Sequence, residues 1–112
     1  MTITPKYLSN STSGQAISIA GTTINAATLL HTSSNVAGNM DNIHLTLSNT
    51  GATQQTVILE WGATGAQQAF TVSPSGSTTV PFSFLAGGLS VSAFAQNANF
   101  CFATGRVYVE GP

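Results

Sequence analysis

The fold of this chain is decided by a stretch in which apolar and polar residues alternate, DNIHLTLSN at Asp41–Asn49. Successive side chains of a strand point to opposite faces, so one face here is apolar and the other polar. The apolar positions are Ile43, Leu45 and Leu47. QTVILEW at Gln55–Trp61 repeats the pattern. We expect two half-buried strands, and the turn-forming residues 49–52 favour an antiparallel hairpin between them.

Segments of similar composition recur along the chain and are separated by turn-forming residues. The further expected strands are Ala16–Ile24, Thr28–His31, Gln67–Val72, Ser77–Phe84, Leu89–Ala95 and Phe100–Glu110. Seven to eight short strands with turns about every eight to twelve residues indicate an all-β chain, an antiparallel β-sandwich or jelly roll of one domain. Residues 1–14 are rich in Thr, Ser, Asn, Gly and Pro and predict a flexible arm before a sandwich domain at 15–112.

Charge is nearly absent from this sequence. Two basic and three acidic residues stand among 112, whereas 43 are Thr, Ser, Asn or Gln. Two basic residues do not make a nucleic-acid or anionic-membrane surface, and no stretch reaches the roughly 20 apolar residues of a spanning helix. A single cysteine, Cys101, and a start without a signal-peptide pattern favour synthesis in a reducing cytoplasm. A surface with so few charges produces only a weak electric field, which suits a protein packed against other proteins.

The residues that catalysis or metal binding would need are few. The carboxylates are Asp41, Glu60 and Glu110, and the imidazoles are His31 and His44. They lack zinc-ligand spacing, and the sequence has no Gly-x-Ser-x-Gly nucleophile motif. We therefore expect no enzyme activity, no catalytic or metal site and no cofactor. His44, on the polar face of its strand, is interpreted as a solvent-facing or interface side chain.

The last expected strand has two unusual faces. One carries small residues, namely Cys101, Ala103, Gly105, Val107 and Val109. The other carries Phe100, Phe102, Thr104, Arg106, Tyr108 and Glu110. If the small residues face the core, the aromatic residues form an outward patch that suits a subunit interface. The alternative exchanges the faces or inserts a bulge and puts the phenylalanines in the core. Val80, Phe82 and Phe84 raise the same question.

Glu60 and Arg106 both lie inside expected strands. A cross-strand or intersubunit pair would satisfy both charges and fix the register of neighbouring subunits. The alternative is a pair of exposed strand charges that oppose edge-to-edge aggregation. Trp61, at the end of its strand, is interpreted as a core or rim aromatic, with sugar stacking as the alternative.

Four segments resemble short virion structural proteins of tailed bacteriophages. They are Thr28–Thr32, Val57–Gly62, Gly88–Ala95 and Gly105–Val109. The resemblance implies a β-sandwich associated with the phage head. It further implies a decoration or cement protein, commonly trimeric, that binds the major capsid protein on the outer head surface of the virion and clamps neighbouring capsid subunits.

The candidate interface residues follow from both lines of reasoning. Phe100, Phe102 and Tyr108 are the aromatic anchors, Ile3, Tyr7 and Leu8 are docking points on the arm, and Glu60 and Arg106 are the charged pair. Deletion of residues 1–13 is expected to leave the sandwich folded and to weaken capsid attachment. Two other classes remain open, a carbohydrate-binding or host-attachment module using Trp61 and Tyr108, and another virion or pilus-like structural subunit such as a tail-tube or connector protein.

Overall fold

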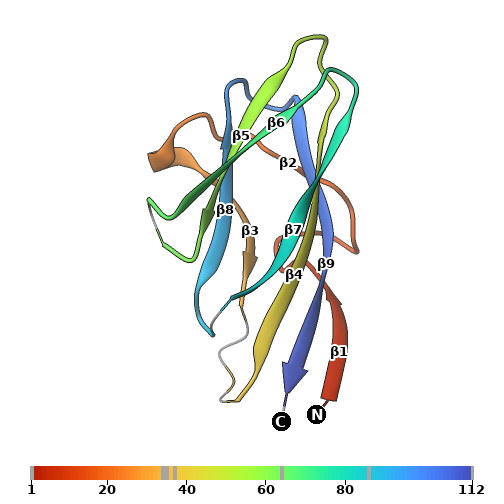
Figure 1. The fold of residues 1–112 in the computed structure, drawn as a ribbon, viewed down its shortest axis with the longest axis vertical. Coiled ribbons are helices and arrows are strands. Elements are labelled where there is room, and N and C mark those ends of the chain that lie inside the picture. Colours follow the sequence, from red (N-terminus) through yellow and green to blue (C-terminus); the bar gives the residue numbers. More distant parts are fainter. Residues whose placement is uncertain (1, 34–35, 37, 64, 86, 112) are drawn as a thin grey trace.

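Strands make up most of the chain in the computed structural model, which describes residues 2–33, 36, 38–63, 65–85 and 87–111 (Figure 1). In these ranges the strands are β1 Thr2–Tyr7, β2 Ile17–Ser18, β3 Thr28–Thr32, β4 Met40–Asn49, β5 Gln55–Trp61, β6 Gln67–Val72, β7 Ser77–Leu85, β8 Ser90–Ala95 and β9 Cys101–Gly111. One short 3-10 turn, Ile24–Ala26, precedes β3, and the expected strand Ala16–Ile24 is wrong beyond Ile17–Ser18. The expected strand boundaries of β5 and β6 are confirmed at both ends, and those of β4, β8 and β9 within one residue.

The strands form two antiparallel sheets. Sheet A has the order β1-β9-β4-β7, with β2 also paired to β9, and sheet B has the order β3-β8-β5-β6. The pairs β1/β9, β3/β8, β4/β7 and β5/β6 are nested, as if one long hairpin had been folded over on itself. This nesting is the arrangement of a jelly roll. The expected all-β fold, an antiparallel sandwich of jelly-roll type, is confirmed.

The predicted hairpin between Asp41–Asn49 and Gln55–Trp61 is wrong. β4 pairs with β7 and β9 in sheet A, whereas β5 pairs with β6 and β8 in sheet B. Residues 50–54 therefore turn a corner between the sheets, and the side-chain amide of Asn49 holds that corner by donating to the Thr53 carbonyl (2.8 Å). Turn-forming residues bend the chain equally well in a hairpin or in a corner, so local composition does not separate the two.

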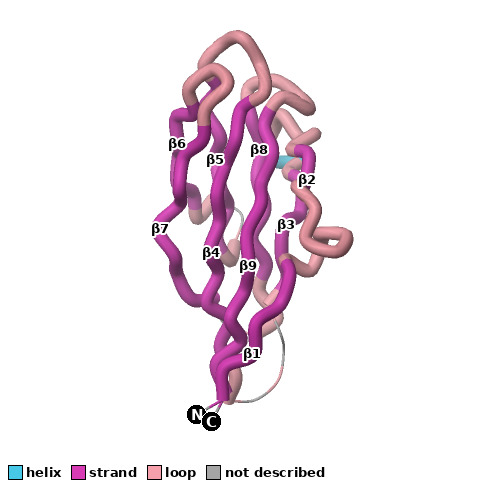
Figure 2. Tube along the Cα trace, turned by 90° about the vertical axis from the view of Figure 1, so that its right-hand side faces the viewer, coloured by secondary structure: helices cyan, strands magenta, loops and turns pink. Residues whose placement is uncertain are grey.

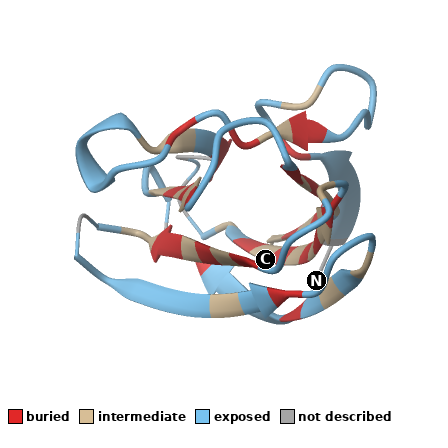
Figure 3. Ribbon diagram, turned by 90° about the horizontal axis from the view of Figure 1, so that it is seen from above, coloured by how far each residue is buried: buried red, intermediate tan, exposed pale blue. Residues whose placement is uncertain are grey.

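The core lies between the inner faces of the two sheets, as the end-on view in Figure 3 shows. Sheet A contributes Ile43, Leu45, Leu47, Val80, Leu85, Cys101, Ala103, Val107 and Val109, and sheet B contributes Leu30, Val57, Leu59, Val72, Val91, Ala93 and Ala95. Trp61 and Phe70 are partly buried against this cluster. The inward face expected for β4 is confirmed, and Trp61 is a rim aromatic whose indole N–H donates to the Phe84 carbonyl of the opposite sheet (3.4 Å).

The N-terminal segment belongs to the sandwich, so the predicted arm is wrong for its described residues. β1 pairs with β9 from Arg106 to Gly111, and Figure 2 shows the two strands side by side with both chain ends at one tip. Leu8 is 1% exposed and packs in the core. The Ser9 backbone N–H donates to Nδ1 of His31 (2.9 Å), and the Ser9 hydroxyl accepts from the Thr32 N–H (2.7 Å). The free edge of β9 supplies hydrogen-bond partners for the backbone of β1. The polar composition of the segment does not predict this pairing.

A bulge in β7 decides which way its aromatic residues point. Leu45 is opposite Val80, but Ile43 is opposite Ser83, so β7 carries one extra residue over this interval. An extra residue reverses the alternation of faces beyond it. Val80 is consequently buried, whereas Phe82 and Phe84 are exposed. Pro81 stands at the bulge, where its missing N–H disturbs the ladder least.

Candidate interface on the outer face of sheet A

The small residues of β9 face the core, which settles the orientation that the sequence left open. Cys101, Ala103 and Val107 are fully buried, whereas Phe102 and Tyr108 are half-buried and Arg106 is exposed on the other face. β9 also passes very close to β4 at Gly105. A Cβ atom added to this glycine would lie only 2.1 Å from the His44 carbonyl oxygen. The alternative with the phenylalanines of this strand in the core is therefore wrong.

The register places side chains from four strands on the outer face of sheet A in rows. Directly opposed residues of antiparallel strands project to the same side. Arg106 of β9 is opposite Tyr7 of β1 and His44 of β4, and at the far end of β9 Glu110 is opposite Ile3 and Met40. Between them runs a middle row of Pro5, Tyr108, Asn42 and Phe84.

This surface exposes large apolar side chains. The exposed fractions are 61% for Tyr7 and Phe82, 57% for Ile3, 46% for Met40 and 45% for Phe84. We call the aromatic face the set Ile3, Pro5, Tyr7, Met40, Asn42, His44, Phe82, Phe84, Arg106, Tyr108 and Glu110. Exposed apolar surface of this extent is typical of sites of interaction.

The polar side chains of the aromatic face are ordered by their neighbours. The His44 ring stacks on Phe82 (centroids 4.9 Å apart) and meets Tyr108 edge-on at 5.3 Å. Arg106 donates to the Tyr108 hydroxyl (3.3 Å), and Asn42 donates to Glu110 (3.4 Å). A groove of about 540 Å³ is lined in part by His44, Phe82 and Tyr108. Neighbouring side chains thus fix the orientation of these polar groups.

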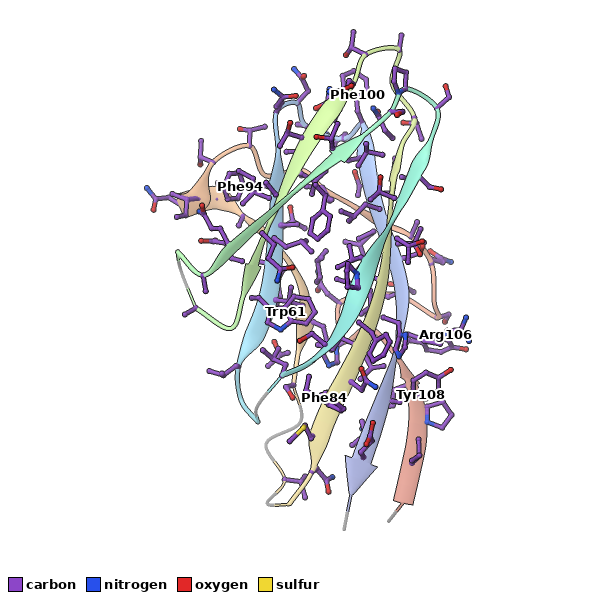
Figure 4. The ribbon with its side chains drawn as sticks, in the orientation of Figure 1. Trp61, Phe84, Phe94, Phe100, Arg106 and Tyr108 are labelled. Atoms are coloured by element: carbon purple, nitrogen blue, oxygen red, sulfur yellow. The ribbon has the colours of Figure 1, made fainter. Side chains whose placement is uncertain are left out.

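The structure brings together only some of the predicted interface residues. Ile3, Tyr7, Arg106 and Tyr108 lie on the aromatic face, and Phe102 lies on the same side of β9 further along. Phe100 precedes β9 and lies at the opposite end of the sandwich from Tyr108 (Figure 4). Leu8 is a core residue, so its predicted role as an exposed docking point is wrong.

The predicted pair between Glu60 and Arg106 is not formed within the described chain. Glu60 lies in sheet B and is 6% exposed, and its carboxylate accepts the Gly65 backbone N–H (3.0 Å). Arg106 lies in sheet A and faces solvent. The interpretation as two exposed strand charges therefore holds for Arg106 and is wrong for Glu60.

The sequence left open whether Phe82 and Phe84 point outward, and it did not single out Met40 as an interface candidate. Intervals of two residues separate Val80, Phe82 and Phe84, so a regular strand would put all three side chains on one face. Only the bulge in β7 separates Val80 from the two phenylalanines. Met40 lies one residue before the expected start of its strand.

A buried pair of His31 and Asp41 lies between β3 and β4. The His31 Nε2 to Asp41 Oδ2 distance is 2.7 Å, and the two side chains are 4% and 2% exposed. Because Nδ1 accepts the Ser9 N–H, the ring proton is on Nε2 and is donated to Asp41. Both ring nitrogens are thus occupied, so this histidine is held as a structural link between the N-terminal segment and both sheets.

Other kinds of site find no support in the part of the chain that the structure describes. In the described ranges, no three His, Cys, Asp or Glu side chains gather as metal ligands would. Within the same residues, no helix has the length and apolar character to cross a bilayer. Cys101 is buried on the inner face of β9, and burial raises the pKa of its thiol above the ordinary value.

Comparison with known proteins supports the class of fold. No protein family and no curated protein matches the sequence. Among solved structures, the chain is similar to a protein of Bacillus endospore appendages, which are described as a novel family of disulfide-linked pili. The TM-score is 0.58 with 13% sequence identity, over 98% of this chain and 88% of the other. At this identity the likeness shows a shared β fold.

Proposed function

We propose that this chain is a non-enzymatic structural subunit that assembles through the aromatic face, and that it decorates the outer surface of a bacteriophage head by binding the major capsid protein. The observation that carries the structural role is the row of exposed apolar side chains on sheet A, with Tyr7 and Phe82 each 61% exposed. Burying such side chains against a protein partner removes apolar surface from water, which is the main favourable term in association.

The scarcity of charge supports the same role. Two of the three carboxylates, Asp41 and Glu60, are buried inside the chain and already accept hydrogen bonds. The remaining polar surface is largely hydroxyl and amide, so it can be covered by a partner without the desolvation cost of ions. The placement on a phage head comes from the resemblance of Thr28–Thr32, Val57–Gly62, Gly88–Ala95 and Gly105–Val109 to virion structural proteins.

A second candidate is a subunit of a surface filament. Its support is the fold shared with the endospore appendage protein, which is an argument from fold alone. Those appendages are disulfide-linked pili. Here Cys101 is the one cysteine of the sequence and is buried. A filament of this chain would therefore be held by non-covalent contacts.

The test uses the particles made by the genome that encodes the chain. Purified virions are analysed by quantitative mass spectrometry and cryo-electron microscopy. We expect many copies per particle, with density for the sandwich on the outside of the head. Absence from heads, or presence in tails or in cell-surface filaments, would overturn the proposal.

Two variants connect this test to the aromatic face. Phe82→Ser removes an exposed aromatic side chain of β7, and Leu29→Ser removes an apolar side chain that is 41% exposed on β3 of sheet B. We expect the first variant to weaken assembly of the subunits through the aromatic face and thereby to lower the occupancy of the protein on heads, and the second to leave it unchanged. Equal occupancy for both would remove the aromatic face from the proposal.

A further inference from the structure

We propose that the aromatic face is occupied by a second copy of this chain, packed face to face across a two-fold axis that crosses β9 at Tyr108. This inference rests on the proposed function, because it names the partner of the same assembly surface. It follows from the order of charges on β9 and from the register of the strands beside it.

Arg106 and Glu110 are placed symmetrically about Tyr108. All three lie on the outer face of one strand at intervals of two residues. With a rise of about 3.4 Å per residue, each charge lies about 7 Å from the middle residue. Arg106 is held by the Tyr108 hydroxyl (3.3 Å) and Glu110 by the Asn42 amide (3.4 Å). One positive and one negative charge thus flank a single aromatic ring.

The other charged residues of the chain do not enter this surface. Asp41 and Glu60 are 1% and 6% exposed. Lys6 is opposite Val107, whose side chain is buried, so its position alternates away from the outer face of sheet A. The aromatic face therefore carries one cation and one anion.

Two copies pack face to face when the two-fold axis lies in the plane of contact. The axis proposed here lies in that plane and runs perpendicular to the strands. Rotation about such an axis at Tyr108 sets the two β9 strands antiparallel, one above the other. Arg106 of each copy then faces Glu110 of the other, as an isologous contact requires. An axis parallel to the strands would instead set like charges against each other, which opposes association.

The same rotation also matches the apolar side chains. Ile3 and Met40 lie in the row of Glu110, and Tyr7 and His44 lie in the row of Arg106. Exchange of the rows therefore places Ile3 over Tyr7 of the second copy and Met40 over His44. The middle row, which includes Phe84, meets its own copy. One operation pairs both the charges and the apolar groups, and this agreement favours a second copy over an unrelated partner.

A three-fold ring would use the surface differently. In a ring, the aromatic face of each subunit meets another surface of the next subunit, so Arg106 and Glu110 would not pair reciprocally. The resemblance to phage proteins implies a trimer, whereas the arrangement on β9 points to a two-fold pair. The number of subunits in the oligomer therefore distinguishes the two arrangements.

The experiment compares four charge variants with the wild type by light scattering after gel filtration over a range of concentrations. In the two-fold pair, residue 106 of each copy faces residue 110 of the other, so the contact occurs twice. Arg106→Glu and Glu110→Arg each put like charges together at both contacts. We expect each to weaken the dimer by about tenfold or more. The double variant R106E/E110R restores opposite charges, and we expect a dimer within about threefold of wild type. Lys6→Glu makes the same change in net charge as Arg106→Glu off the aromatic face, and we expect no effect.

The outcomes separate this inference from the proposed function. A stable trimer, a monomer at every concentration, single variants as strong as wild type, or a double variant as weak as the singles would each overturn the two-fold pairing. Urea midpoints of all variants, measured in parallel, show that the folded state is retained. Occupancy on phage heads is measured separately, so a trimer that decorates heads would refute the pairing and leave the proposed function standing.

Discussion

Breaking the buried His31–Asp41 pair is expected to cost a large part of the stability of this chain. The Nε2–H of His31 donates to the Asp41 carboxylate at 2.7 Å, with both side chains nearly inaccessible to water. A hydrogen bond to a charged group contributes about 1.5–3 kcal/mol, and a buried donor left without an acceptor costs about 1–3 kcal/mol more. Asp41→Ala leaves the Nε2–H of the neutral ring without an acceptor, so the two contributions together are expected to lower the free energy of unfolding by about 3–5 kcal/mol.

The measurement is urea unfolding followed by tryptophan fluorescence, since Trp61 packs at the rim of the same core. With a slope of about 2 kcal/mol per molar urea, Asp41→Ala is expected to lower the midpoint by about 1.5–2.5 M. Asp41→Asn keeps an oxygen that can accept the ring proton and loses only the charge, so we expect about 1 kcal/mol.

A double-mutant cycle isolates the contact from the other effects of each substitution. His31→Ala, Asp41→Ala and the double variant are compared with wild type, and we expect a coupling energy of at least about 1 kcal/mol. A loss below about 1 kcal/mol for Asp41→Ala, or additive single effects, would refute the assignment of this pair as a structural link.

Three further outcomes are expected. Gly105→Ala would place a Cβ 2.1 Å from the His44 carbonyl oxygen, so β9 and β4 must separate, and we expect a loss of about 1–3 kcal/mol in urea unfolding against little change for the neighbouring Thr104→Ala; an unaffected midpoint would contradict the close approach. Leu8→Ala removes a side chain that is 1% exposed in the core and should cost about 2–5 kcal/mol, whereas Thr12→Ala, at an exposed position of the same segment, should cost little; equal midpoints would restore the flexible arm. Cys101 is buried with a raised thiol pKa, so a thiol reagent should label the native chain slowly at pH 8 and the urea-unfolded chain at once, and a rise in pH through the ordinary thiol range should favour the unfolded state, where the thiolate forms more readily. Rapid labelling of the native chain would show that β9 is accessible.

Part of the aromatic face could be predicted from the sequence. The alternation along residues 100–110 identified two faces, and the small side chains of one made a close-packed inner face plausible, so Arg106 and Tyr108 were candidates on the other. Phe82 and Phe84 could not be separated from Val80, because a one-residue bulge in β7 leaves no clear mark in a period-two pattern.

The sequence by itself determined the strands from β3 to β9 and the inner faces of the central ones. The alternation at Asp41–Asn49 and Gln55–Trp61 is local, because the side of a strand on which a residue points depends only on its position along the backbone. Tertiary structure decided which strands pair. β4 and β5 lie in different sheets, and β1 is a strand because β9 offers a free edge. Pairing joins segments far apart in sequence through backbone groups that nearly every residue carries, so side-chain composition does not specify it.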